Sequence, residues 1–152
     1  MARAAATRAT CYRLNVGAIL VEDRNVVGVG YNGSPAGAAH CTGVGCGYFT
    51  PEGCKVLHAE ANAIERAQYA ARSSDAVCEL YVTHSPCGAC VSAILSARRS
   101  LVRRLMVGEV YFETPYRDPT PIRRLIEGDV RVLQLLPSGL MVDQSTGVLV
   151  DE

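Results

Sequence analysis

The sequence predicts an α/β fold, a single domain built as a three-layer α/β/α sandwich around a five-stranded mixed sheet. The chain has 152 residues, which is near the usual size of one domain and enough to bury a core. Short apolar runs with the composition of buried strands alternate along it with Ala-rich helical segments. Strands interleaved with helices are typical of a sheet with helices on both faces. We therefore expect one domain over residues 1–152.

Each element is predicted from a local pattern. Residues 16–21 and 26–31 are apolar runs separated by a short polar turn, which indicates a hairpin. The segment that begins at His58 is rich in Ala and lacks Gly and Pro, so it predicts a helix. Pro86 is placed to open another helix, because the first helical position needs no N–H. The other expected elements are a helix near 2–13, strands at 79–83, 105–112 and 130–136, a helix at 121–126, and a small hairpin within 140–150.

Composition and charge exclude several classes of protein. The formal net charge is zero, which gives no electrostatic reason to expect binding to nucleic acid or to a membrane surface. No apolar run approaches the roughly 20 residues that cross a bilayer, and the N-terminus lacks the apolar core of a signal peptide. Seven cysteines in such a chain favour metal binding over disulfides. We expect a cytoplasmic enzyme.

Two short motifs carry the chemistry. His58-Ala-Glu60 is followed downstream by Pro86-Cys87-Gly-Ala-Cys90, so the chain offers three zinc ligands and one additional carboxylate. A structural zinc site has four protein ligands, whereas a catalytic site has about three and leaves a position for water. Both motifs fall at predicted helix starts, where the positive end of the helix dipole lowers the pKa of a thiol. This pattern is that of zinc nucleobase deaminases, with Glu60 moving the protons.

Four segments resemble the deoxycytidylate (dCMP) deaminases of the cytidine deaminase superfamily. They are the predicted first strand, Tyr12–Val21; the loop Gly-Tyr-Asn-Gly-Ser-Pro-Ala-Gly, Gly30–Gly37; and the two zinc segments, His58–Ile64 and Ser85–Cys90. Free-nucleoside cytidine deaminases usually carry a cysteine in place of His58. The tRNA adenosine deaminases lack both this loop and the cysteine-rich insert before the histidine. The C-terminal third of the chain resembles the family only loosely.

The resemblance implies zinc-dependent hydrolysis of dCMP to dUMP and ammonia, which would supply dUMP for thymidylate synthesis. Glu60 would take a proton from the zinc-activated water, deliver it to N3 of cytosine and assist the departing amine. Two alternatives stay open. One is a zinc deaminase of another base or nucleoside, such as guanine or cytidine. The other is a zinc-binding module without catalysis, which a test of ammonia release would identify.

The resemblance also implies the residues that contact the substrate. Asn32 and Asn62 would line the nucleotide pocket, since amides suit a neutral base edge and sugar hydroxyls. Arg117 is the candidate for the 5′-phosphate, which favours a guanidinium. A turn asparagine, a helix-surface asparagine and a solvated arginine are the structural alternatives. The full set of expected substrate contacts is Asn32, Ser34, Ala59, Asn62, Tyr116 and Arg117.

The other cysteines suggest a second metal. Some dCMP deaminases hold a structural zinc in the region that corresponds to the Gly-rich insert at 32–55. The expected thiolates are Cys11, Cys41, Cys46 and Cys54, with His40 as a competing ligand and several free buried cysteines as the alternative. By resemblance alone we also expect a homo-oligomer, with a hexamer favoured, and regulation by dCTP as activator and dTTP as inhibitor.

Overall fold

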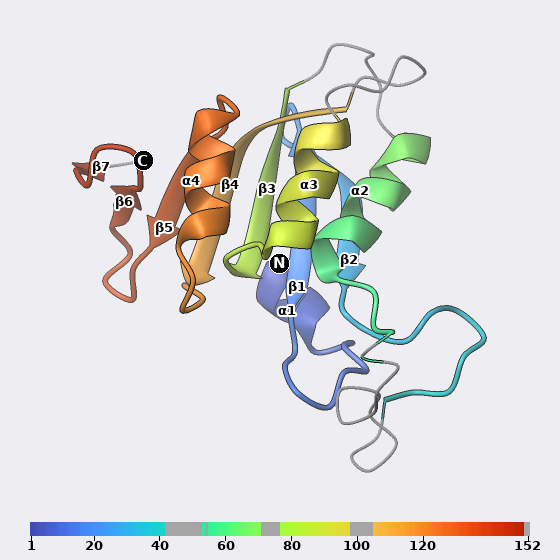
Figure 1. Cartoon of the computed structure of the whole chain (residues 1–152). Helices are drawn as coiled ribbons and strands as arrows, with labels where there is room; N and C mark the ends of the chain where they lie inside the picture. Colours follow the sequence, from blue (N-terminus) through green and yellow to red (C-terminus); the bar gives the residue numbers. More distant parts are fainter. Residues whose placement is uncertain (42–52, 54, 71–76, 98–104, 151–152) are drawn as a thin grey trace.

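The structure is a computed structural model that describes residues 1–41, 53, 55–70, 77–97 and 105–150. Its centre is a mixed sheet of strand order β2-β1-β3-β4-β5-β6-β7 (Figure 1). Strands β3, β4 and β5 run parallel, and every other neighbouring pair is antiparallel. The strands are β1 (Gly17–Glu22), β2 (Asn25–Tyr31), β3 (Val77–His84), β4 (Met106–Thr114), β5 (Arg131–Leu135), β6 (Met141–Asp143) and β7 (Leu149–Val150).

The predicted mixed α/β fold is confirmed, but the predicted number of strands is wrong. The sheet has seven strands and not five. The additional two are the hairpin expected within residues 140–150, because β6 pairs with β5 and extends the sheet at that edge. At the other end of the order, β1 and β2 form the expected hairpin. Its turn uses positive φ values at Asp23 and Arg24.

The helices are distributed unevenly over the two faces of the sheet. One face carries α2 (Ala59–Ala70), α3 (Gly88–Ala97) and α4 (Thr120–Glu127), drawn in front of the strands in Figure 1. The opposite face carries α1 (Ala2–Ala6), so in the described residues the third layer of the predicted sandwich is this short helix. None of the described helices has the length and apolar content to cross a bilayer.

Helix α1 is shorter than the predicted segment 2–13. The chain leaves it through two tight turns, in which Arg8 N–H bonds Ala5 O and Ala9 N–H bonds Ala6 O. Thr10 N–H then donates to Asn32 O at 3.1 Å, which directs the backbone toward the end of β2. The carbonyl oxygen of Asn32 therefore accepts the Thr10 N–H, which would have bonded within α1 if the helix had continued.

The core lies between the sheet and helices α2–α4. Side chains alternate across each strand, so every second residue of β1, β3 and β4 faces these helices. Leu20, Leu80, Val110 and Phe112 are all buried there. Parallel strands covered by helices are expected to bury apolar side chains in this way. The core fixes α2, which His58 directly precedes, and β3, whose end leads to Cys87 and Cys90.

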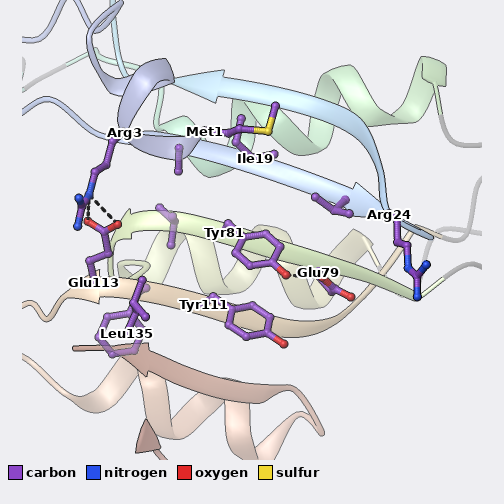
Figure 2. Close-up of a pocket in the computed structure, with 13 residues that line it drawn as sticks. Met1, Arg3, Ile19, Arg24, Glu79, Tyr81, Tyr111, Glu113 and Leu135 are labelled. Carbon is purple, nitrogen blue, oxygen red and sulfur yellow. Dashed lines mark hydrogen bonds and ion pairs between the residues drawn. The ribbon is translucent and has the colours of Figure 1, made fainter. Parts of the chain in front are cut away.

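The opposite face is partly open (Figure 2). Tyr81 and Tyr111 are partners in the β3–β4 register and stack there, with ring centroids 4.6 Å apart. Each hydroxyl donates to a glutamate on its own strand, and Arg3 forms an ion pair with Glu113 at 2.9 Å. A cavity of about 640 Å³ lies over these residues. It is the larger of the two cavities described here, yet the predicted zinc ligands do not line it.

Candidate active site

His58 and Cys87 occupy equivalent places in the two βα segments. His58 immediately precedes α2, and its carbonyl accepts the Asn62 N–H at 3.1 Å. Cys87 immediately precedes α3, and its carbonyl accepts the Val91 N–H at 2.9 Å. Each residue therefore caps the start of its helix through its backbone. Cys90 lies in the first turn of α3, on the same side as Cys87.

The three predicted zinc ligands converge. His58 Nδ1 lies 3.2 Å from Cys90 Sγ and 3.4 Å from Cys87 Sγ, and the two sulfur atoms are 3.6 Å apart. Among the residues that the structure describes, this is the group of His, Cys and acidic side chains placed to hold a metal ion. One imidazole and two thiols fit zinc, and three protein ligands leave a fourth coordination position. The donor set therefore fits a catalytic zinc.

The two thiols are electrostatically unequal. Hydrogen bonds from Cys90 and His58 lower the pKa of Cys87 to about 3. The neighbouring Cys87 thiolate and burial raise the pKa of Cys90. The pair thus shares one proton by itself, and a dication would favour both groups as thiolates. Zinc at this site would be held by two thiolates and one neutral imidazole.

Glu60 is held next to this group, in the first turn of α2. Its side chain is 4% exposed, and burial raises the pKa of its carboxyl group. It lines the same cavity as His58 and Cys87. A buried carboxyl with a raised pKa is suited to accept and return a proton near neutral pH.

A cavity of about 140 Å³ opens onto these side chains. Besides His58, Glu60 and Cys87, it is lined by three of the predicted substrate contacts, Asn32, Ala59 and Tyr116. The Tyr116 ring lies 6.1 Å from the His84 ring, and burial raises the pKa of its hydroxyl. The cavity therefore combines the zinc ligands with amide and aromatic groups.

Asn32 also has a structural role. Its Oδ1 accepts the Val16 N–H at 2.8 Å, and its Nδ2 donates to Leu14 O at 2.7 Å. The side chain thus joins the end of β2 to the segment that precedes β1. The next residue, Gly33, exchanges two backbone hydrogen bonds with Leu57, which directly precedes His58. The loop predicted to bind substrate is therefore joined to the zinc-ligating histidine.

Three other predicted contacts do not line this cavity. Asn62 Nδ2 donates to Tyr31 O at 2.9 Å and so joins α2 to β2. The half-buried Ser34 donates its backbone N–H to Thr10 Oγ1 at 3.1 Å. Arg117 is exposed. Their roles toward a substrate stay predictions.

Arg13 was not foreseen as a site residue, yet it lines the cavity with Tyr116. Its charge opposes the rise in the pKa of the Tyr116 hydroxyl, which indicates that the two side chains are near each other. The only signal in the sequence was its place in the segment resembling the family's first strand. A pattern of buried strand residues gives no reason to single out one arginine there.

The expected second zinc site is described only in part. Cys11 and Cys41 are half-buried, and Cys11 lines the cavity beside the catalytic group. Cys46 and Cys54 lie outside the described residues. The competing ligand, His40, is exposed.

Comparisons with known proteins agree with the geometry. The family model described as the cytidine and deoxycytidylate deaminase zinc-binding region matches residues 1–108. ComE operon protein 2 of Bacillus subtilis is 39% identical over 111 residues, which are 73% of this chain and 57% of that protein. Deoxycytidylate deaminase of Mycobacterium phage D29 is 42% identical over 108 residues, which are 64% of this chain and 82% of that protein.

The fold also matches a solved structure. The crystal structure of dCMP deaminase from the cyanophage S-TIM5, in complex with dCMP and dUMP, superimposes with a TM-score of 0.70 at 31% sequence identity. The match covers 88% of this chain and 90% of that one. The present chain thus has nearly the extent of the cyanophage enzyme, whereas it spans little more than half of ComE operon protein 2.

Proposed function

Because the chain belongs to the family with the cytidine and deoxycytidylate deaminase zinc-binding region, we propose that it hydrolyses dCMP to dUMP and ammonia. The observation that carries this proposal is the convergence of His58, Cys87 and Cys90 beside the buried carboxyl of Glu60. The likeness to the phage and cyanophage dCMP deaminases supports the choice of substrate.

Each residue of the group has a distinct part in the reaction. His58, Cys87 and Cys90 would hold zinc, which when bound lowers the pKa of water toward neutrality. Two thiolates offset the charge of the metal, so a nearby proton acceptor is needed. Glu60 takes the proton of the attacking water and delivers it to N3 of the base. It then assists proton transfer to the amine at C4, which leaves as ammonia.

The residues that line the cavity support recognition of a nucleotide. We assign the 5′-phosphate to Arg13, because Arg13 lines the cavity whereas Arg117 does not. Asn32, which lines the cavity, would contact the base or the sugar. Asn62, Ser34 and Arg117 stay as alternative contacts of the same substrate.

A substrate panel tests the proposal. Zinc-loaded protein is incubated with dCMP, CMP, deoxycytidine, cytidine, guanine and adenosine, and ammonia release is measured. We expect dCMP to be deaminated with a clear preference over deoxycytidine. Equal turnover of the unphosphorylated nucleoside, or activity on guanine instead, would identify a deaminase of another class. Absence of ammonia with every substrate would indicate a zinc-binding module.

Three finer features are part of the same proposal. The insert at 32–55 would hold a structural zinc through Cys11, Cys41, Cys46 and Cys54. The protein would form a homo-oligomer, with a hexamer favoured, activated by dCTP and inhibited by dTTP. It would work in the cytoplasm, where its product supplies thymidylate synthesis. These features are supported by the resemblance to dCMP deaminases and by the cysteine content of the chain.

A further inference from the structure

Ser85 is a buried polar residue that neither ligates the metal nor lines the active-site cavity. It stands between the last residue of β3 and the Pro86-Cys87 turn, and it is 2% exposed. A buried hydroxyl is costly unless it is hydrogen-bonded. Its Oγ accepts the backbone N–H of Tyr116 at 2.9 Å, and its own N–H donates to Thr114 O at 2.9 Å.

These two bonds prolong the contact between β3 and β4 beyond the end of the sheet. The β3–β4 register ends with the pair His84 and Thr114. Beyond this pair, the N–H of Tyr116 donates to the side-chain oxygen of Ser85 and not to a carbonyl oxygen of β3. The hydroxyl of Ser85 therefore fixes the backbone of the β4–α4 loop against the turn that carries Cys87.

The residue held in this way lies at the cavity. Tyr116 lines it together with His58, Glu60 and Cys87, and its ring is 6.1 Å from that of His84. Because the residue is 44% exposed, packing alone constrains it weakly. Its backbone hydrogen bond to Ser85 therefore fixes the backbone from which the ring extends.

We propose that Ser85 is a positioning residue that holds Tyr116 at the active-site cavity and couples the β4–α4 loop to the turn that carries Cys87. This inference rests on the proposed function for its kinetic consequence, but its structural consequence can be measured without substrate. Without the Ser85 hydroxyl, the loop loses its anchor, and the substrate has to order Tyr116 when it binds. The free-energy cost of ordering Tyr116 then raises KM, whereas the rate of the chemical step stays the same.

A fluorescence experiment tests the anchor itself. The chain has no tryptophan, so Tyr116→Trp creates a single reporter in the lining of the cavity. Acrylamide quenching of this reporter is compared with and without Ser85→Ala. Ser85→Thr serves as the hydroxyl-retaining variant. Ser92→Ala is the matched control, because it removes a serine hydroxyl from α3 that bonds Gly88 O and Arg124. Quenching should rise with Ser85→Ala alone; equal quenching in all variants would overturn the proposal.

Kinetics then test the coupling to binding in zinc-loaded protein that retains Tyr116. Ser85→Ala should raise KM for dCMP by about 3–10-fold, the range of one net hydrogen bond, with kcat within about twofold and zinc content unchanged. In a Tyr116→Ala background the same change should have little further effect, because residues that act through one another are not additive. An undiminished effect in that background would overturn the proposal. If wild-type protein does not deaminate dCMP, the proposed function fails, while the quenching result still decides the role of Ser85.

Discussion

Gly30 of β2 and Ala59 of α2 are in such close contact that no side chain fits between them. A Cβ atom at Gly30 would lie 1.9 Å from the carbonyl oxygen of Ala59 and 2.6 Å from the backbone nitrogen of Ala63. Ala59 stands between His58 and Glu60 in the chain. The distance between β2 and α2 therefore determines where both the zinc ligand and the proton carrier lie.

Replacing Gly30 should disturb both stability and the metal site. Gly30→Ala forces α2 away from β2, and we expect a loss of about 1–3 kcal/mol in the free energy of unfolding, as for overpacking of a core. Gly28→Ala is the matched control, because its Cβ would lie 2.2 Å from the carbonyl oxygen of Ala63, one helical turn further on. Thermal melts should show similar destabilisation, but only Gly30→Ala should weaken zinc retention against a chelator. Equal zinc retention in the two variants would contradict the argument.

Glu60→Gln should separate proton transfer from metal binding. We expect zinc content to stay that of the wild type while kcat for dCMP falls by about 10²–10⁴, the usual contribution of general acid–base catalysis. Glu65→Gln, on the exposed side of the same helix, should leave the rate unchanged. Loss of zinc together with activity in Glu60→Gln would show that Glu60 is a ligand or a structural residue.

Arg13 and Arg117 can be distinguished by how they affect phosphorylated and unphosphorylated substrates. Arg13→Gln should lower kcat/KM for dCMP by about 10–100-fold, the range for hydrogen bonds to a charged group, with little change for deoxycytidine. Arg117→Gln should leave both values near those of the wild type. The reverse pattern would indicate that Arg117, and not Arg13, recognises the 5′-phosphate. A loss common to both substrates would mean that Arg13 supports the site without recognising phosphate.

Elemental analysis tests the second zinc. We expect two zinc ions per chain in wild-type protein and about one in Cys41→Ser, with the His58 site still loaded, because a structural site needs all four ligands. Cys78→Ala is the control, since Cys78 is fully buried in the core and belongs to neither proposed site. A content of one zinc per chain in wild-type protein would show that no second zinc site is formed by Cys11, Cys41, Cys46 and Cys54.

Sedimentation tests the proposed assembly. We expect a homo-oligomer, with a hexamer favoured, whose dCMP kinetics respond to dCTP and dTTP through different affinities for two states. A monomer would contradict the first part, and kinetics indifferent to both nucleotides would contradict the second.

The zinc group could be predicted from the sequence because its two motifs are short, each stands at a helix start, and together they match the pattern of zinc deaminases. His58 and Cys87 each stand immediately before a helix, and the spacing from Cys87 to Cys90 places both thiols on one side of a helical turn. The positions of Arg13 in the cavity lining and of Ser85 beside Tyr116 could not be predicted. They depend on where the first strand begins and on which loop lies beside β3, and neither is encoded in spacing along the chain.

The sheet was predictable where strands are long and apolar, and less so at its edges. β6 and β7 have three and two residues, too few to establish a period in the sequence. Their pairing as a hairpin could be predicted from the sequence, but the pairing of β6 with β5 could not. The end of α1 was missed for a related reason: the hydrogen bond from Thr10 to Asn32 joins residues far apart in the sequence.

The placement of the ligands before two different helices also has a thermodynamic consequence. A zinc ion held by His58, Cys87 and Cys90 acts as a removable crosslink that closes the loop comprising α2, β3 and the connections between them. Because zinc would bind the folded chain more tightly than the unfolded chain, metal loading should raise the free energy of unfolding by mass action. Zinc loading should then also slow proteolysis of the chain.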